Sequence, residues 1–124
     1  MKLIRFADGD AAPRFGLAVG DHAVTLEVLQ GRSGITHPGL QDSRAYLAGL
    51  PETEGAARRL LSWAEAHLAE LAVGERPGLD SVRLHEPVEV AALFDFGLTP
   101  RHLENSAETM MKFEKDDPRT APLL

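Results

Sequence analysis

Three polar residues near the C-terminal end of the sequence have types and spacing that resemble the opening of an active site. Asp95 follows an apolar run, His102 comes next, and Asn105 lies one helical turn after His102. Because Phe94 and Phe96 flank Asp95, its carboxylate would be partly desolvated, and a divalent cation would stabilise it. Asn105 could orient a substrate or the imidazole of His102. The types and spacing of the three residues therefore make them candidates for a catalytic site.

Each of these residues also has an interpretation without catalysis. Asp95 could cap the turn that follows it, because aspartate commonly bonds to nearby backbone amides in turns. A histidine near the start of a helix is often a surface residue, and an exposed asparagine on a helix needs no further explanation. The residue types alone leave both interpretations open, and only the fixed offsets between the three residues favour function.

The elements that would position the triplet are a buried strand and a helix. The apolar run 88–96 predicts the strand, which Asp95 would close. Thr99 is suited to the N-cap of the following helix and Pro100 to its first position. An apolar stripe at helical spacing extends that helix to about residue 115 and consists of Leu103, Ala107, Met110 and Met111.

The N-terminal part predicts an α+β fold. Apolar residues alternate with period two over three short segments, which indicates an antiparallel β-meander spanning 4–6, 15–19 and 24–28. We expect residues 31–40 to form a loop, a short helix to run from Asp42-Ser43 to Leu50, and a long amphipathic helix to reach about Leu71. The long helix should pack on the meander. Residues 81–85 alternate again, and the expected domains are 1–80 and 81–124.

Composition excludes several classes of function. The chain has 124 residues, 44% of them hydrophobic and 26% charged, with a formal net charge of -6 and no cysteine. An acidic chain without a basic stripe does not predict nucleic acid as a partner. No apolar run approaches the roughly 20 residues of a membrane span, and the N-terminus lacks a signal peptide. We therefore expect a cytoplasmic protein without a membrane partner.

The motif Asp95-Phe96, five residues, His102, two residues, Asn105 resembles the fumarylacetoacetate hydrolase family. The opening segment 1–7, together with Gly16-Leu17 and the segment 24–26, is also similar to the small N-terminal domain of that family. The pattern departs from the family at Gly97, where the fumarylacetoacetate hydrolases proper have a substrate-contacting tyrosine, and at Pro100 in the spacer. The particular substrate is therefore left open.

The resemblance implies metal-dependent hydrolysis of a carbon–carbon bond in a 1,3-diketo acid, and it leaves decarboxylation and isomerisation open. It implies that Asp95 is a ligand of Mg²⁺ or Ca²⁺ and that His102 is the general base, a role suited to its ordinary pKa of about 6.5. Asn105 would assist at the same site. The substrate would be an acylpyruvate or a fumarylacetoacetate-like molecule, and the expected assembly is a homodimer.

Asp95 alone cannot hold a hard divalent cation, which requires several oxygen ligands. The family's other carboxylate ligands, a Glu-x-Glu pair and a later Asp, would be expected after Leu124. We therefore expect the 124 residues to be the N-terminal part of such an enzyme, and to be inactive and free of bound metal on their own. The alternative is a non-catalytic interaction module that binds a partner chain.

Overall fold

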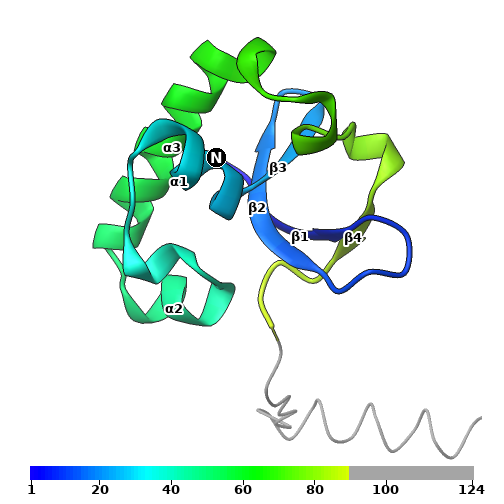
Figure 1. Cartoon of the computed structure of the whole chain (residues 1–124). Coiled ribbons are helices and arrows are strands. Elements are labelled where there is room, and N and C mark those ends of the chain that lie inside the picture. The colour runs from blue at the N-terminus through cyan, green and yellow to red at the C-terminus, as the bar shows by residue number, and fades with distance from the viewer. Residues whose placement is uncertain (90–124) are drawn as a thin grey trace, which may run out of the picture. The chain divides into compact units, whose positions relative to one another are not determined.

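The N-terminal sheet forms because its apolar residues alternate along short strands separated by turn residues. The computed structural model describes residues 1–89. Strands β1 (Leu3–Ala7), β2 (Arg14–Val19) and β3 (His22–Thr25) form the expected antiparallel meander. Gly20 has a φ of 57° in the turn between β2 and β3, a conformation that glycine adopts without steric cost. The α+β class is thus confirmed for the described residues (Figure 1).

A fourth strand, β4 (Arg83–His85), completes the sheet in the order β3-β2-β1-β4. It pairs antiparallel with β1, so that Arg5 lies opposite His85. The alternation of residues 81–85 predicted this strand, but it did not predict that the strand pairs with β1. The compact unit that contains the sheet runs Met1–Val90 and includes β4, which pairs with β1.

The expected third strand was wrong at its C-terminal end. Residues 24–28 alternate as a strand would, yet β3 ends at Thr25 and helix α1 (Leu26–Ser33) begins directly after it. The Thr25 hydroxyl accepts a hydrogen bond from the backbone N–H of Val28 at 3.1 Å, which satisfies a free donor of the first helical turn. Leu26 and Leu29, one turn apart, are then both fully buried. The expected loop over 31–40 likewise begins only after this helix.

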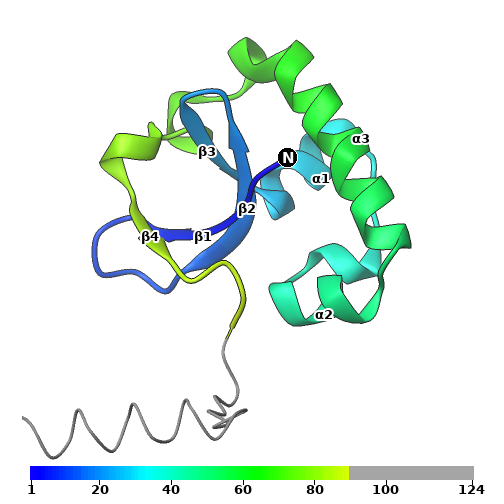
Figure 2. The ribbon, with the colours of Figure 1, turned by 180° about the vertical axis from the view of Figure 1, so that it is seen from behind.

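The remaining helices agree closely with the sequence pattern. Helix α2 (Ser43–Ala48) is capped by the side chain of Asp42, and the long amphipathic helix is α3 (Glu52–His67). Short 3₁₀ helices are η1 (Pro38–Leu40), η2 (Leu68–Glu70), η3 (Val73–Glu75) and η4 (Leu79–Ser81). Both views show α1, α2 and α3 on one side of the sheet (Figures 1 and 2). None of the helices within residues 1–89 has the length and apolar character needed to cross a membrane.

The core lies between the sheet and these helices. Strands β2 and β3 contribute Leu17 and Val24, helix α1 contributes Leu29, and α3 contributes Leu60, all of which are fully buried. Burial of a leucine side chain contributes about 1.5–3 kcal/mol relative to exposure. The long helix is therefore held mainly by its apolar stripe. The expected strand 88–96 and helix 99–115 lie outside the described residues, apart from Val88 and Glu89.

Thr53 fixes the start of α3 against the segment that precedes it. Its side chain is fully buried, and its hydroxyl donates a hydrogen bond to the backbone oxygen of Tyr46 at 2.7 Å. Its methyl group fills the space beside two glycines. A Cβ atom on Gly39 or Gly49 would lie 2.4 Å or 2.5 Å from Thr53 Cγ2. Because Gly39 and Gly49 have no side chain, the methyl group of Thr53 can pack closely against both.

A two-residue mutational cycle tests this packing. Gly49→Ala should lower the free energy of unfolding by about 1–3 kcal/mol, because overpacking forces neighbouring atoms to move. Thr53→Ser removes the methyl group and keeps the hydroxyl. Because this change relieves the clash, the double variant should be more stable than the sum of the single effects by about 1 kcal/mol or more in urea unfolding.

Gly55→Ala is the matched control for this cycle. Gly55 lies within α3, and a Cβ there meets nothing within 4 Å. That variant should be stabilised by roughly 0.5–1 kcal/mol, because alanine favours helix interiors over glycine. Strict additivity of Gly49→Ala and Thr53→Ser would show that Thr53 Cγ2 does not limit the space beside Gly49.

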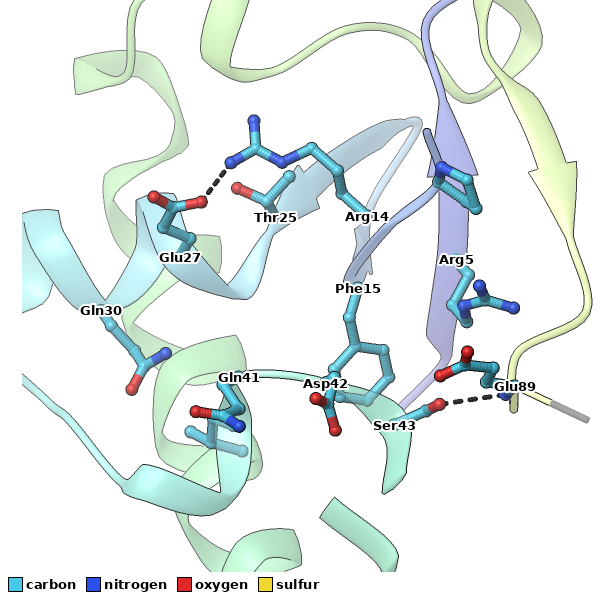
Figure 3. A pocket seen from close by; sticks show the side chains of 12 residues that line it. Arg5, Arg14, Phe15, Thr25, Glu27, Gln30, Gln41, Asp42, Ser43 and Glu89 are labelled. Carbon is cyan, nitrogen blue, oxygen red and sulfur yellow. Dashed lines mark hydrogen bonds and ion pairs between the residues drawn. The ribbon is translucent and has the colours of Figure 1, made fainter. Parts of the chain in front are cut away.

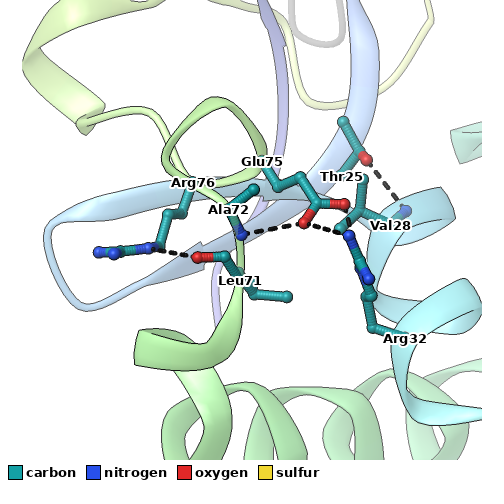
Figure 4. Close-up of polar contacts among 7 residues, drawn as sticks. All are labelled: Thr25, Val28, Arg32, Leu71, Ala72, Glu75 and Arg76. Atoms are coloured by element: carbon teal, nitrogen blue, oxygen red, sulfur yellow. Dashed lines mark hydrogen bonds and ion pairs between the residues drawn. The ribbon is translucent and has the colours of Figure 1, made fainter.

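A polar tie joins η3 to α1 (Figure 4). The guanidinium of Arg32 donates two hydrogen bonds to the carboxylate of Glu75, at 3.1 Å and 2.8 Å. The backbone N–H of Ala72 also donates to Glu75, at 3.0 Å. The hydrogen bonds from Arg32 and then from Ala72 lower the pKa of Glu75 below its ordinary value of 4.5. The charged form of Glu75 is thus the form that stabilises the fold.

The lowered pKa gives this tie a defined pH dependence. A carboxyl with a folded-state pKa below its unfolded value stabilises the fold above the unfolded pKa, and loses that contribution as the pH falls through the folded pKa. Glu75→Gln should therefore lower the urea midpoint at about pH 7, and the deficit should shrink towards about pH 3. Glu70→Gln is the control. Glu70 is exposed at the end of η2, and its variant should have the urea midpoint of the parent protein at both pH values. A deficit of equal size at both pH values would contradict the assignment.

Candidate functional site

The triplet singled out by the sequence, Asp95, His102 and Asn105, lies outside the described residues. Its predicted roles therefore stay predictions. Among residues 1–89, no group of three or more His, Asp or Glu side chains is placed to hold a metal ion.

A cleft of about 670 Å³ lies between the sheet and the starts of α1 and α2. We call it the β2–α2 cleft. Figure 3 shows its side chains arriving from strands and helices that are distant in sequence. Its lining consists of Arg5, Pro13, Arg14, Phe15, Thr25, Glu27, Gln30, Leu40, Gln41, Asp42, Ser43 and Glu89.

The sheet register places an arginine and an aromatic ring side by side in the cleft. Arg5 of β1 is directly opposite Phe15 of β2, so their side chains share one face of the sheet. The Phe15 ring is 9% exposed and packs edge-on against Tyr46, with ring centroids 5.9 Å apart. Burial, and secondarily the charge of Glu54, raises the pKa of Tyr46, while Arg58 opposes the shift. The ring that supports Phe15 is therefore neutral over the physiological pH range.

Charged groups lie at two sides of the cleft. Arg14 of β2 forms an ion pair with Glu27 of α1. Arg5 donates a hydrogen bond to the backbone oxygen of Glu86 at 3.2 Å. In the view of Figure 3, Arg5 and Glu89 lie on one side of the Phe15 ring and Gln30 on the other.

The segment that follows β4 forms one wall of the cleft through Glu89. The backbone N–H of Glu89 donates to the Ser43 hydroxyl at 3.0 Å, and its carboxylate lies 3.9 Å from the guanidinium of Arg44. With the bond from Arg5 to Glu86, these contacts tie residues 86–89 to β1 and α2. A second, apolar pocket of about 100 Å³ beside this wall is lined by Leu3, Phe15, Ser43, Tyr46, Leu47, Pro87 and Val88.

Sequence reasoning did not single out Arg5, Arg14 or Glu89. Arg5 appeared as the polar member of an alternating strand, and Ser43 appeared only as part of a helix start. The signal that could have drawn attention to Arg5 is its place between two apolar neighbours, opposite an aromatic residue in a hairpin. Recognising the cleft also required the position of Glu89, which depends on the pairing of β4 with β1.

Comparison of the chain with models of known protein families, with curated proteins and with solved structures finds no match. The likeness of residues 95–105 to the fumarylacetoacetate hydrolases therefore rests on the residues themselves.

Ser43→Ala tests whether the 86–89 wall is held by its contact with α2. The variant removes the hydroxyl that accepts from the Glu89 N–H, and a lost hydrogen bond of this kind costs about 1 kcal/mol. Amide hydrogen exchange at Glu89 should accelerate about fivefold, because exchange follows the free energy of local opening. Asp42→Ala, which loses the cap of α2, should change exchange mainly at Ala45. Unchanged exchange at Glu89 in Ser43→Ala would show that the wall is held by other contacts.

Proposed function

We propose that the chain is the N-terminal part of a fumarylacetoacetate hydrolase-like enzyme that cleaves a carbon–carbon bond in a 1,3-diketo acid. The observation that carries this proposal is the motif in which Asp95-Phe96, His102 and Asn105 keep the spacing of that family. In this proposal Asp95 is a metal ligand, His102 is the general base and Asn105 orients the substrate or the imidazole.

The residues that resemble the family's small N-terminal domain lie mostly in paired strands of the described fold, and this supports the proposal. Residues 3–7 form β1, and Gly16-Leu17 lies in β2 opposite the end of β3. A Cβ on Gly16 would lie 2.3 Å from the backbone oxygen of Val24, so glycine is required there. These residues are thus constrained by a strand-to-strand contact rather than scattered on a surface.

The proposed chemistry divides between the metal and the side chains. Mg²⁺ or Ca²⁺, when bound, would supply stabilisation of the negative charge that develops on the substrate oxygens. His102 would take a proton from water, since histidine titrates near neutral pH. Asp95 would supply one oxygen ligand, and further carboxylates of the complete enzyme would supply the others.

A diketo-acid assay tests the assignment of His102. The protein encoded by the natural reading frame that contains these 124 residues should consume acylpyruvates in the presence of Mg²⁺. His102→Ala should lower kcat by about 10²–10⁴-fold, the usual contribution of a general acid or base. The measurement is the loss of enol absorbance of the substrate at saturating metal concentration.

His85→Ala is the matched control, because His85 lies on β4 and is not part of the motif Asp95, His102 and Asn105. Its kcat should equal that of the parent enzyme. Unchanged turnover in His102→Ala would exclude the proposed base. The alternative proposal, a non-catalytic module that binds a partner chain, predicts no turnover of any acylpyruvate with Mg²⁺ or Ca²⁺.

A further inference from the structure

The β2–α2 cleft contains charges of both signs. Two guanidinium groups, from Arg5 and Arg14, and three carboxylates, from Glu27, Asp42 and Glu89, line it. A purely anionic ligand would meet more negative than positive charge, and a purely cationic ligand would meet Arg5. A ligand that carries one charge of each sign can find a partner for both, provided that suitable groups retain free hydrogen-bonding capacity.

Arg5 has the free capacity needed to bind a carboxylate. Within residues 1–89, the ion-paired arginines are Arg14, Arg32, Arg44 and Arg58. Arg5 is half-buried at the cleft, forms no such pair in that part of the chain, and uses one donor for the oxygen of Glu86. A guanidinium has five donors and binds carboxylates in a bidentate manner. Within residues 1–89, it is therefore the cation of the cleft that has no carboxylate partner.

Asp42 and Glu89 have free capacity to accept from an ammonium group. One oxygen of Asp42 accepts from the Ala45 N–H at 2.8 Å, which leaves its other oxygen. The carboxylate of Glu89 lies 3.9 Å from Arg44, beyond hydrogen-bond distance. Because an ammonium group carries three donors, it can bridge acceptors of this kind.

The space between these groups suits a small molecule with an apolar body. The cleft volume of about 670 Å³ falls in the range typical of small-molecule sites. Phe15 contributes a ring to the lining, and Gln30 and Gln41 add neutral polar groups. An apolar side group on the ligand could pack on the Phe15 ring while the charged end remains among the polar groups.

We propose that the β2–α2 cleft binds a small zwitterionic molecule of the α-amino acid class. Its carboxylate pairs with Arg5, its ammonium group is bound by Asp42 and Glu89, and its side group packs on Phe15. All of these residues belong to the sheet, to the N-cap of α2 or to the 86–89 wall. The proposal does not rest on the proposed catalytic function, because it involves neither the metal nor residues 95–105.

Three probes with the same aromatic body separate the contributions of the two charges. L-phenylalanine carries both charged groups, 3-phenylpropionate carries only the carboxylate, and 2-phenylethylamine carries only the ammonium group. Titration of the isotope-labelled 124-residue protein should give a dissociation constant for L-phenylalanine at least about tenfold below those of the other two, a difference of about 1.4 kcal/mol. Shifted amide signals should map to Arg5, Phe15, Asp42 and Ser43.

Two variants should change the probe preference in opposite ways. Arg5→Gln should weaken L-phenylalanine and 3-phenylpropionate about tenfold and leave 2-phenylethylamine unchanged, because it removes only the carboxylate partner. Glu89→Gln should weaken L-phenylalanine and 2-phenylethylamine and leave 3-phenylpropionate unchanged. Arg83→Gln, at an exposed position on β4 outside the cleft, is the control and should bind as the parent protein.

Three outcomes would overturn the proposal. They are equal affinity for the three probes, no saturable binding of L-phenylalanine up to about 20 mM, and unchanged preference in both cleft variants. If Arg5→Gln fails to fold, as judged by circular dichroism, Glu89→Gln decides alone, because Glu89 is exposed and its hydrogen bond to Ser43 is made by the backbone, which the substitution keeps. These readouts involve no turnover, so a negative result here is distinct from failure of the diketo-acid assay.

Discussion

The arrangement of the described residues depends on the change from strand to helix at Thr25. Its hydroxyl caps α1, and the chain turns back over the sheet at that point. Leu26 and Leu29 can then be buried against the strands, and Arg32 comes within reach of Glu75. If β3 continued to residue 28 in its register with β2, Glu27 would lie directly opposite Arg14 within the sheet and not on a helix beside the cleft. One capping interaction thus determines a core contact, a polar tie and one wall of the cleft.

The change at Thr25 also explains where sequence reasoning succeeded and where it failed. The alternation over 24–28 is compatible with a strand, because Val24, Leu26 and Val28 share a period of two. Burial of Leu26 together with Leu29 is a helical pattern, and the two patterns overlap at Leu26. Thr25 followed by Glu27 is only a weak helix-start signal. By contrast, α3 has its apolar stripe over several turns, and no competing period exists there.

Long-range pairing was the second feature that local patterns could not predict. The alternation of residues 81–85 indicated a strand, but nothing in those residues specifies β1 as its partner. Leu84 is 57% exposed, so hydrophobic burial does not determine the register of β4. The pairing carries residues 86–89 to the start of α2, and this placement completes the β2–α2 cleft. The cleft therefore could not be predicted from the sequence, because its formation depends on this long-range pairing.

The charges that line the cleft can be compared with those of the two proposed ligands, the 1,3-diketo acid and the zwitterionic amino acid. A 1,3-diketo acid would bring one negative charge, or two in a fumarylacetoacetate-like molecule, to a surface that already carries three carboxylates and two guanidiniums. Like charges within a few ångströms disfavour binding unless a cation separates them. The charge pattern of the cleft therefore fits a ligand that carries its own positive group.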